Sequence, residues 1–205
     1  MFHNRAKVAA MVAVLFMTAC SQAPNSSGDN QATQASTPRG PVSGKTAFWE
    51  MYKSAHSWAG DLVPLALQSK MVPGIKNNAG KAAMWSATFG SASRHEARTL
   101  SYSVASHPPD IYQGVTVGRA LPWAGPTREA LPFQTSEFAV DSDAAYKTAL
   151  SAAAAWVKKH PDQEVSFALG NASRFSGPAW YVHWGSEKSG YAVFVNAATG
   201  SVIKN

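Results

Sequence analysis

The sequence has one cysteine, little charge and no apolar run long enough to cross a bilayer. Cys20 is the only cysteine among 205 residues, so no disulfide can form within one chain. The apolar run at residues 8–17 has ten residues, whereas a membrane-spanning helix needs about 20. Only 15% of the residues are charged, for a formal net charge of +6. The basic residues are scattered, so we expect no specific nucleic-acid site.

Motifs for catalysis and for metal binding are also missing. The sequence contains no Gly-x-Ser-x-Gly and no His-Glu-x-x-His, and no two histidines of the mature chain have metal-ligand spacing. Ser201 and Lys204 match Ser-x-x-Lys only by letters, because positions i and i+3 of a strand point to opposite faces. We therefore expect no catalytic residues, no metal, no cofactor and no enzymatic activity.

The amino-terminal segment has the pattern of an export signal. Arg5 and Lys7 precede the apolar run, and Ala19 and Cys20 follow it. The length of the run suits the apolar region of a signal peptide, and an ordinary signal peptide or a short membrane anchor is the alternative. The ending Met-Thr-Ala-Cys resembles a bacterial lipoprotein signal, in which a peptidase cleaves before the cysteine and the cysteine carries the lipid.

This resemblance implies a cellular location. Residues 1–19 would be removed, and Cys20 would carry acyl chains such as palmitate and hold the protein on a membrane. Ser21 resembles the outer-membrane sorting preference of Gram-negative lipoproteins, which implies an outer-membrane protein facing the periplasm. Residues 21–44 are rich in Ser, Gln, Asn, Pro and Gly, so we expect a flexible tether over residues 20–44.

The rest of the chain contains one pattern twice. Residues 84–91 and 179–186 share one pattern, in which the second residue is Trp and is followed by three residues, a large aromatic residue and Gly-Ser. Alternate residues, starting from Trp85 and from Trp180, fall on one face of a strand. A helical stripe precedes each pattern, with apolar residues at i, i+3, i+7 and i+10 from Phe48 and from Tyr146.

These patterns predict an α+β fold of two tandem units, each with one helix on an antiparallel sheet of about four strands. Helices are predicted at 46–59 and 142–160, the second capped by Asp141 and ended before Pro161. Strands are predicted near 62–69, 82–90, 96–105, 113–120, 163–170, 178–185, 190–196 and 201–204. The predicted organisation is a first unit at 45–120, a Pro-rich connector at 121–140 and a second unit at 141–205.

The second unit resembles the PepSY domain, a cystatin-like module of peptidase propeptides and envelope proteins. The residues that match are the alanine-rich helix at 144–159, PAWYV at 178–182 and YAVFVNAATGSVI at 191–203. Asn196 stands where an aspartate is usual, and the first unit lacks the Thr-Gly ending. The resemblance implies a fold without catalytic residues, and a role in inhibiting, assisting or binding other envelope proteins.

The connector contains the candidate binding residues. Trp123 and Phe133 lie in its proline-rich segments, with Arg119 and Arg128 nearby. Tryptophan and arginine dominate the energetics of many interfaces. The alternative is that Trp123 and Phe133 fill the joint between the two units.

Two functions agree with these observations. The first is a non-enzymatic envelope lipoprotein, a binding or inhibitory module that acts on another envelope protein. The alternative is a carrier or sensor of a small amphiphile held between helix and sheet. A hydrophobic cavity lined by the tryptophans would favour the carrier, and a solid core would favour the binding module.

Overall fold

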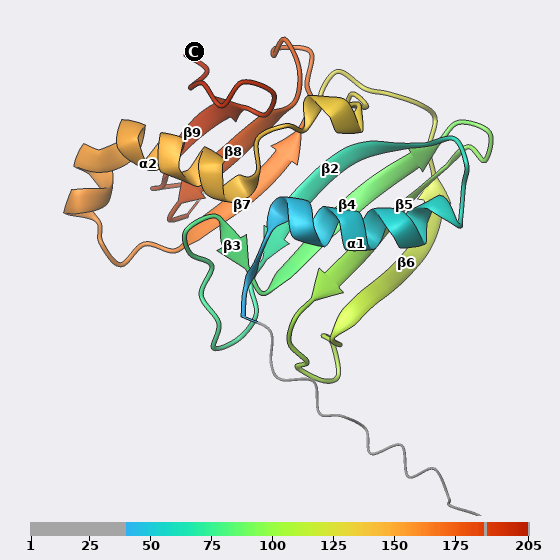
Figure 1. Cartoon of the computed structure of the whole chain (residues 1–205), viewed down its shortest axis with the longest axis horizontal. Coiled ribbons are helices and arrows are strands. Elements are labelled where there is room, and N and C mark those ends of the chain that lie inside the picture. Colours follow the sequence, from blue (N-terminus) through green and yellow to red (C-terminus); the bar gives the residue numbers. More distant parts are fainter. Residues whose placement is uncertain (1–39, 187, 205) are drawn as a thin grey trace, which may run out of the picture. The chain divides into compact units, whose positions relative to one another are not determined.

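The computed structural model describes residues 40–186 and 188–204. This part of the chain forms an α+β fold, as predicted, and Figure 1 shows how its helices and strands are arranged. The elements are β1 (Val42–Ser43), α1 (Gly44–His56), β2 (Leu62–Lys70), β3 (Lys81–Ala82), β4 (Met84–Ser91), β5 (Glu96–Ser103), β6 (Gly114–Pro122), the short 3-10 helix η1 (Thr135–Glu137), α2 (Ser142–Lys159), β7 (Val165–Gly170), β8 (Ala179–Trp184) and β9 (Tyr191–Asn196).

One antiparallel sheet of seven strands organises the fold, in the order β6-β5-β4-β2-β7-β8-β9. Strands β1 and β3 form a separate small sheet. Both helices lie on one face of the large sheet, with α1 over β2, β4 and β5 and α2 over β8 and β9 (Figure 1). The other face carries no helix among the described residues.

The strands of the two predicted units belong to this single sheet. Strand β2 pairs with β7 through three residue pairs, Ala66 with Gly170, Leu67 with Leu169 and Gln68 with Ala168. The sheet therefore has an amino-terminal half, β2 with β4, β5 and β6, and a carboxy-terminal half, β7 with β8 and β9. The strand predicted at 201–204 is a single bridge between Val195 and Val202.

The core lies between the helices and the sheet. Phe48, Met51 and Ala55 of α1 are completely buried, and the ring of Phe48 contacts Phe89 of β4 at 5.7 Å. On α2 the buried stripe consists of small residues, Ala145, Ala149 and Ala153, which let the helix approach the sheet closely. The predicted helical stripes thus face the sheet.

Trp85 and Trp180 lie at the centre of this core. Both are fully buried, and their rings meet edge to face with centroids 6.3 Å apart. The Nε1 of Trp85 donates to the Val42 carbonyl at 3.0 Å, and the Nε1 of Trp180 donates to the Val140 carbonyl at 2.9 Å. Each acceptor lies two residues before the first residue of a helix.

The two helices begin side by side. The backbone N–H of Gly44 donates to the Ser142 hydroxyl at 2.7 Å, and that of Lys45 donates to the Asp141 carboxylate at 2.8 Å. Asp141 also accepts from the N–H of Ser142 at 2.7 Å. The predicted cap of the second helix is therefore present, and it also satisfies first-turn donors of α1.

The connector fills the end of the sheet where β2 and β7 stop pairing. The N–H of Phe133 donates to the Pro64 carbonyl of β2 at 3.1 Å, and Leu131 bridges to Asn171 beyond β7. Phe138 is also buried and contacts the rings of Phe48 and Trp180. The connector therefore belongs to the same core as the two halves.

Candidate functional site

The helix-free face of the sheet differs between the two halves. In the amino-terminal half it carries hydroxyl groups, and those of Thr88 and Thr99 lie 2.9 Å apart. In the carboxy-terminal half it carries aromatic rings, because Tyr181 on β8 and Phe194 on β9 alternate with residues that face the helix. A solvated face of an antiparallel sheet is usually polar, so the aromatic half requires an explanation.

Four residues form what we call the Arg174 cluster, namely Arg174, Phe175, Tyr181 and Phe194. The ring of Phe194 lies 5.1 Å from that of Phe175 and 5.1 Å from that of Tyr181. The Arg174 guanidinium stands over two of these rings, 4.7 Å from the centroid of Phe175 and 5.0 Å from that of Phe194. All three rings are only half-buried, so part of each faces solvent.

A groove of about 460 Å³ runs along this cluster. Its floor is made by small residues of β7, including Ala168 and Gly170, and its wall by Glu129 and Ala130 of the connector. An adjoining pocket of about 390 Å³ contains Arg128 beside Arg174. The arrangement places two guanidinium groups at the rim of an apolar groove, which suits a ligand with an acidic group next to an apolar one.

The four predicted binding residues do not come together. Arg128 is exposed beside the Arg174 cluster, whereas Arg119 is exposed on β6, at the opposite edge of the sheet. Phe133 is only 1% exposed and belongs to the core. Trp123 is half-buried over the helix-free face, where a Cβ at Gly90 would come within 3.0 Å of its ring. The binding role of these four residues stays a prediction.

Sequence reasoning did not identify the Arg174 cluster. A signal was present in β9, where Val193, Phe194 and Val195 are consecutive apolar residues. A continuous apolar run in a strand is typical of a strand whose two faces are both covered by other parts of a protein. Arg174 and Phe175 lie in a loop without periodicity, so their position depends on tertiary structure.

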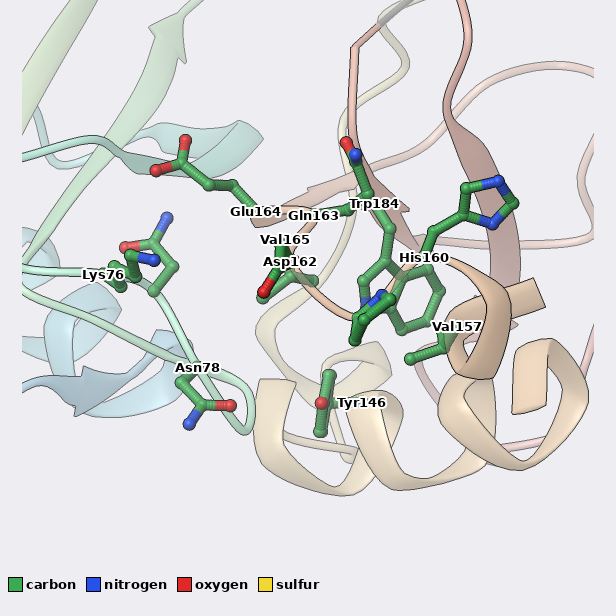
Figure 2. A pocket seen from close by; sticks show the side chains of 12 residues that line it. Lys76, Asn78, Tyr146, Val157, His160, Asp162, Gln163, Glu164, Val165 and Trp184 are labelled. Carbon is green, nitrogen blue, oxygen red and sulfur yellow. The ribbon is translucent and has the colours of Figure 1, made fainter. Parts of the chain in front are cut away.

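A second, polar pocket lies at the end of α2 (Figure 2). It has a volume of about 250 Å³. Lys76 and Asn78 enter it from one side, and Tyr146, Val157 and Trp184 lie on the other. Its histidine, His160, stacks on Trp156 with ring centroids 4.2 Å apart. Within residues 40–186 and 188–204, no group of three His, Cys, Asp or Glu residues is arranged to hold a metal ion.

One carboxylate has a clearly shifted pKa. Asp61 follows α1 and accepts hydrogen bonds from the Ser91 hydroxyl at 2.6 Å and from the Ser93 backbone N–H at 2.8 Å. These bonds favour the charged form and lower the pKa of Asp61 to about 2. Asp61 therefore stabilises the β4–β5 hairpin, and its surroundings are those of a structural carboxylate.

The lipid site and most of the tether lie outside the described residues. Cys20 and the other residues up to 39 are not part of the described structure, so the anchor, the signal peptide and this part of the tether stay predictions from the sequence. The predicted tether is too long at its end, because Val42 and Ser43 form β1 and Gly44 begins α1. In the part of the chain that is described, no helix has the length and hydropathy needed to cross a membrane.

Comparisons with known proteins do not identify a family for this chain. No family model matches the chain, and this comparison therefore does not support the resemblance to PepSY. No curated protein matches it. The structure is similar to that of a putative lipoprotein from Clostridium difficile 630, with a TM-score of 0.49 and 9% sequence identity, over 77% of this chain and 90% of that chain. Similarity at this level does not indicate what the chain binds.

Proposed function

We propose that this protein is a non-enzymatic lipoprotein of the cell envelope that binds another envelope protein through the Arg174 cluster. The observation that carries the proposal is the difference between the two halves of the helix-free face. The same side of one sheet is hydroxyl-rich over β4 and β5 and aromatic over β8 and β9. Half-buried aromatic rings beside an arginine have the composition of interface hot spots.

The charges at the groove define the partner's chemistry. Arg128 and Arg174 line adjoining pockets, and Glu129 is the carboxylate that both pockets contain. A partner segment with an acidic side chain next to an apolar or aromatic one would satisfy the guanidinium groups and cover the rings.

The location is also part of the proposal. The lipoprotein signal supports an anchor at Cys20, and Ser21 supports sorting to the outer membrane, facing the periplasm. A tether between Cys20 and β1 would then separate the binding face from the membrane surface. In this arrangement the protein has two attachments, the lipid and the partner.

We further propose that the two halves are tandem copies of one PepSY/cystatin-like unit. Each half has a helix followed by antiparallel strands, and each places a tryptophan on the second long strand after that helix. The two indole N–H groups donate to carbonyls at corresponding positions, two residues before each helix. Equivalent hydrogen bonds at equivalent positions support duplication more strongly than the sequence pattern does.

The carrier function is supported less well than the binding function. The rings of Trp85, Trp180, Phe138 and Phe167 contact one another between helix and sheet, at centroid distances of 5.7 to 6.3 Å. These rings fill the space between helix and sheet in which the carrier function would require an amphiphile to bind. A filled core favours a protein that acts through its surface.

Photo-crosslinking in intact cells tests the proposed interface. A photoreactive phenylalanine analogue replaces Phe175 in the full chain, and the matched control carries it at Thr99, on the hydroxyl-rich half of the same face. We expect one discrete adduct with an envelope protein from position 175 and none from position 99. Arg174→Ala should abolish the adduct and leave the amount of folded protein unchanged. Equal adducts from both positions, or an adduct that Arg174→Ala does not change, would contradict the proposal.

A further inference from the structure

A separate pocket lies on the helix-bearing side of the sheet, at the end of α1. It has a volume of about 410 Å³, in the range of small-molecule sites. The last turn of α1 and the residues after it form one wall, and β5 and β6 form the other. The residues that line it are Ser54, Ala55, Ser57, Trp58, Arg94, Arg98, Leu100 and Val117.

Two arginines converge on the indole of Trp58 in this pocket. The Arg98 guanidinium carbon lies 4.9 Å from the centroid of the Trp58 ring, and that of Arg94 lies 5.7 Å from it. Neither arginine is paired with a carboxylate, because the one ion pair among the described residues joins Lys53 and Glu50. Two positive charges therefore line one pocket without a negative partner.

Two buried donors in the same pocket lack an acceptor. The Nε1 of Trp58 and the Nε of Arg98 are both inaccessible, and neither has a hydrogen-bond partner in the described structure. Leaving a buried donor unpaired is destabilising, because the donor has lost its hydrogen bond to water. Two such donors beside unpaired cations indicate a place for an acceptor that the protein itself does not supply.

Apolar side chains form another part of the pocket wall. Leu100 is fully buried at its base, and Val117 of the edge strand β6 is 51% exposed at its mouth. Val117 is exposed because α1 covers β2, β4 and β5 more fully than β6. An apolar segment of a ligand could cover Val117 and remove it from water.

We propose that this pocket binds an amphiphilic anion, a carboxylate or phosphate group carrying an apolar tail. The head group would accept hydrogen bonds from Arg98, Arg94 and the Trp58 indole, and the tail would lie against Leu100 and Val117. Arginine has donors and no acceptor, and its planar group fits both carboxylate and phosphate. The pocket is independent of the Arg174 cluster, which lies on the other face of the sheet.

Ligand titration followed by NMR tests this site. The full chain carrying Cys20→Ser, which prevents lipid attachment, is titrated with dodecanoate or dodecyl phosphate below micelle-forming concentrations. The indole N–H resonances of the seven tryptophans report binding, and Trp58→Phe identifies the resonance of Trp58. We expect dodecanoate, dodecyl phosphate or both to shift that resonance, and the one that binds identifies the head group.

Substitutions separate binding from a structural role. Arg98→Gln should weaken binding about tenfold or more, because it removes a charged hydrogen-bonding group. Arg94→Gln, at an exposed position, should also weaken binding and tests the site even if Arg98→Gln fails to fold. Lys147→Gln, at an exposed position of α2 that lines neither this pocket nor the groove of the Arg174 cluster, is the matched control and should leave the affinity unchanged.

Three results would overturn the proposal. The first is binding of dodecanol as tight as that of dodecanoate, which would mean that the charge has no part in recognition. The second is binding of inorganic phosphate as tight as that of dodecyl phosphate, which would mean that the apolar wall has no part. The third is a lower melting temperature of Arg98→Gln with unchanged affinity for both amphiphiles, which would assign the arginines to stability alone.

Discussion

The two halves of the sheet are alike on the side that faces the helices and different on the side that does not. Facing the helices, each half places a fully buried tryptophan whose indole donates to a carbonyl just before a helix. On the helix-free side, one half has paired threonine hydroxyls and the other has the Arg174 cluster. On the side that faces the helices, packing restricts which residues fit in both halves. On the helix-free side no helix packs against the sheet, so the residues of the two halves can differ. The proposed interface rests on this difference between the two halves.

The largest expected effect tests whether the two tryptophans have equivalent roles in the shared core. Trp85→Ala and Trp180→Ala should each destabilise the protein by about 3–5 kcal/mol, the usual range for a buried large aromatic residue. The two costs should be similar because both side chains are fully buried and hydrogen-bonded. Denaturant unfolding of each variant measures them. A cost in one variant less than half that in the other would break the equivalence of the halves.

A smaller effect should come from the point where the two helices begin. A Cβ at Gly44 would stand 2.7 Å from the Trp180 ring and 3.2 Å from the Trp85 ring. Gly44→Ala should therefore destabilise the protein by about 1–3 kcal/mol through overpacking. Gly60→Ala is the control, because nothing lies within 4 Å of a Cβ there.

Unfolding measurements and NMR spectra of these two glycine variants test whether the two halves of the sheet are packed as one core. Gly44 touches both tryptophans, so its substitution should disturb both halves and shift the indole resonances of Trp85 and Trp180 together. A shift confined to one of them would mean that the halves are packed independently. If Gly60→Ala destabilised the protein as much as Gly44→Ala, the close contact of Gly44 with the two tryptophan rings would not explain the effect.

The smallest effect distinguishes the hairpins of the two halves. Hydrogen bonds from Ser91 and Ser93 lower the pKa of Asp61 from 3.8 to about 2. At the corresponding place in the second half, just before β7 and just after β8, the Gly185 N–H donates to the backbone carbonyl of Glu164 at 2.8 Å instead. Since the folded pKa of Asp61 is the lower one, its contribution to stability is present above pH 3.8 and is lost as the pH falls towards 2.

Thermal melts of the wild type and of Asp61→Asn across this pH range measure that contribution. The difference in melting temperature should be constant at neutral and mildly acidic pH and should shrink as the pH falls from about 4 to about 2. A difference that stays the same at the lowest pH would show that the charge of Asp61 has no part in stabilising the hairpin.

The helices and strands could be predicted from the sequence because each depends on the spacing of apolar residues within one segment. The stripe from Tyr146 and the alternation around Trp85 and Trp180 lie within single elements, and the stripe from Phe48 lies within α1 except for Trp58, which follows the helix. The pairing of β2 with β7 was not predictable in this way. It joins residues about a hundred positions apart in the sequence. Both strands are apolar, and this property alone does not specify which other strand each one pairs with.

The candidate sites were less predictable than the fold. Trp123 and Phe133 drew attention because tryptophan and phenylalanine in proline-rich segments are unusual, yet Phe133 is buried beside Pro64. The Arg174 cluster combines a loop with two strands, and the Trp58 pocket combines a helix end with a hairpin and an edge strand. Such sites form only when the chain has folded. The apolar run in β9 indicates a strand covered on both faces, but it does not indicate which residues lie beside that strand.

The place of β2 has a consequence for how the protein is made. Strand β2 is central in the finished sheet, but it is an edge strand of the half to which it belongs. Because a chain is synthesised from its amino terminus, the amino-terminal half is complete at Pro122 while the partner of β2 begins only at Val165. During that interval β2 presents unpaired backbone groups that other chains could join. Pro64 shortens this exposed edge, since a proline offers no N–H to a foreign strand.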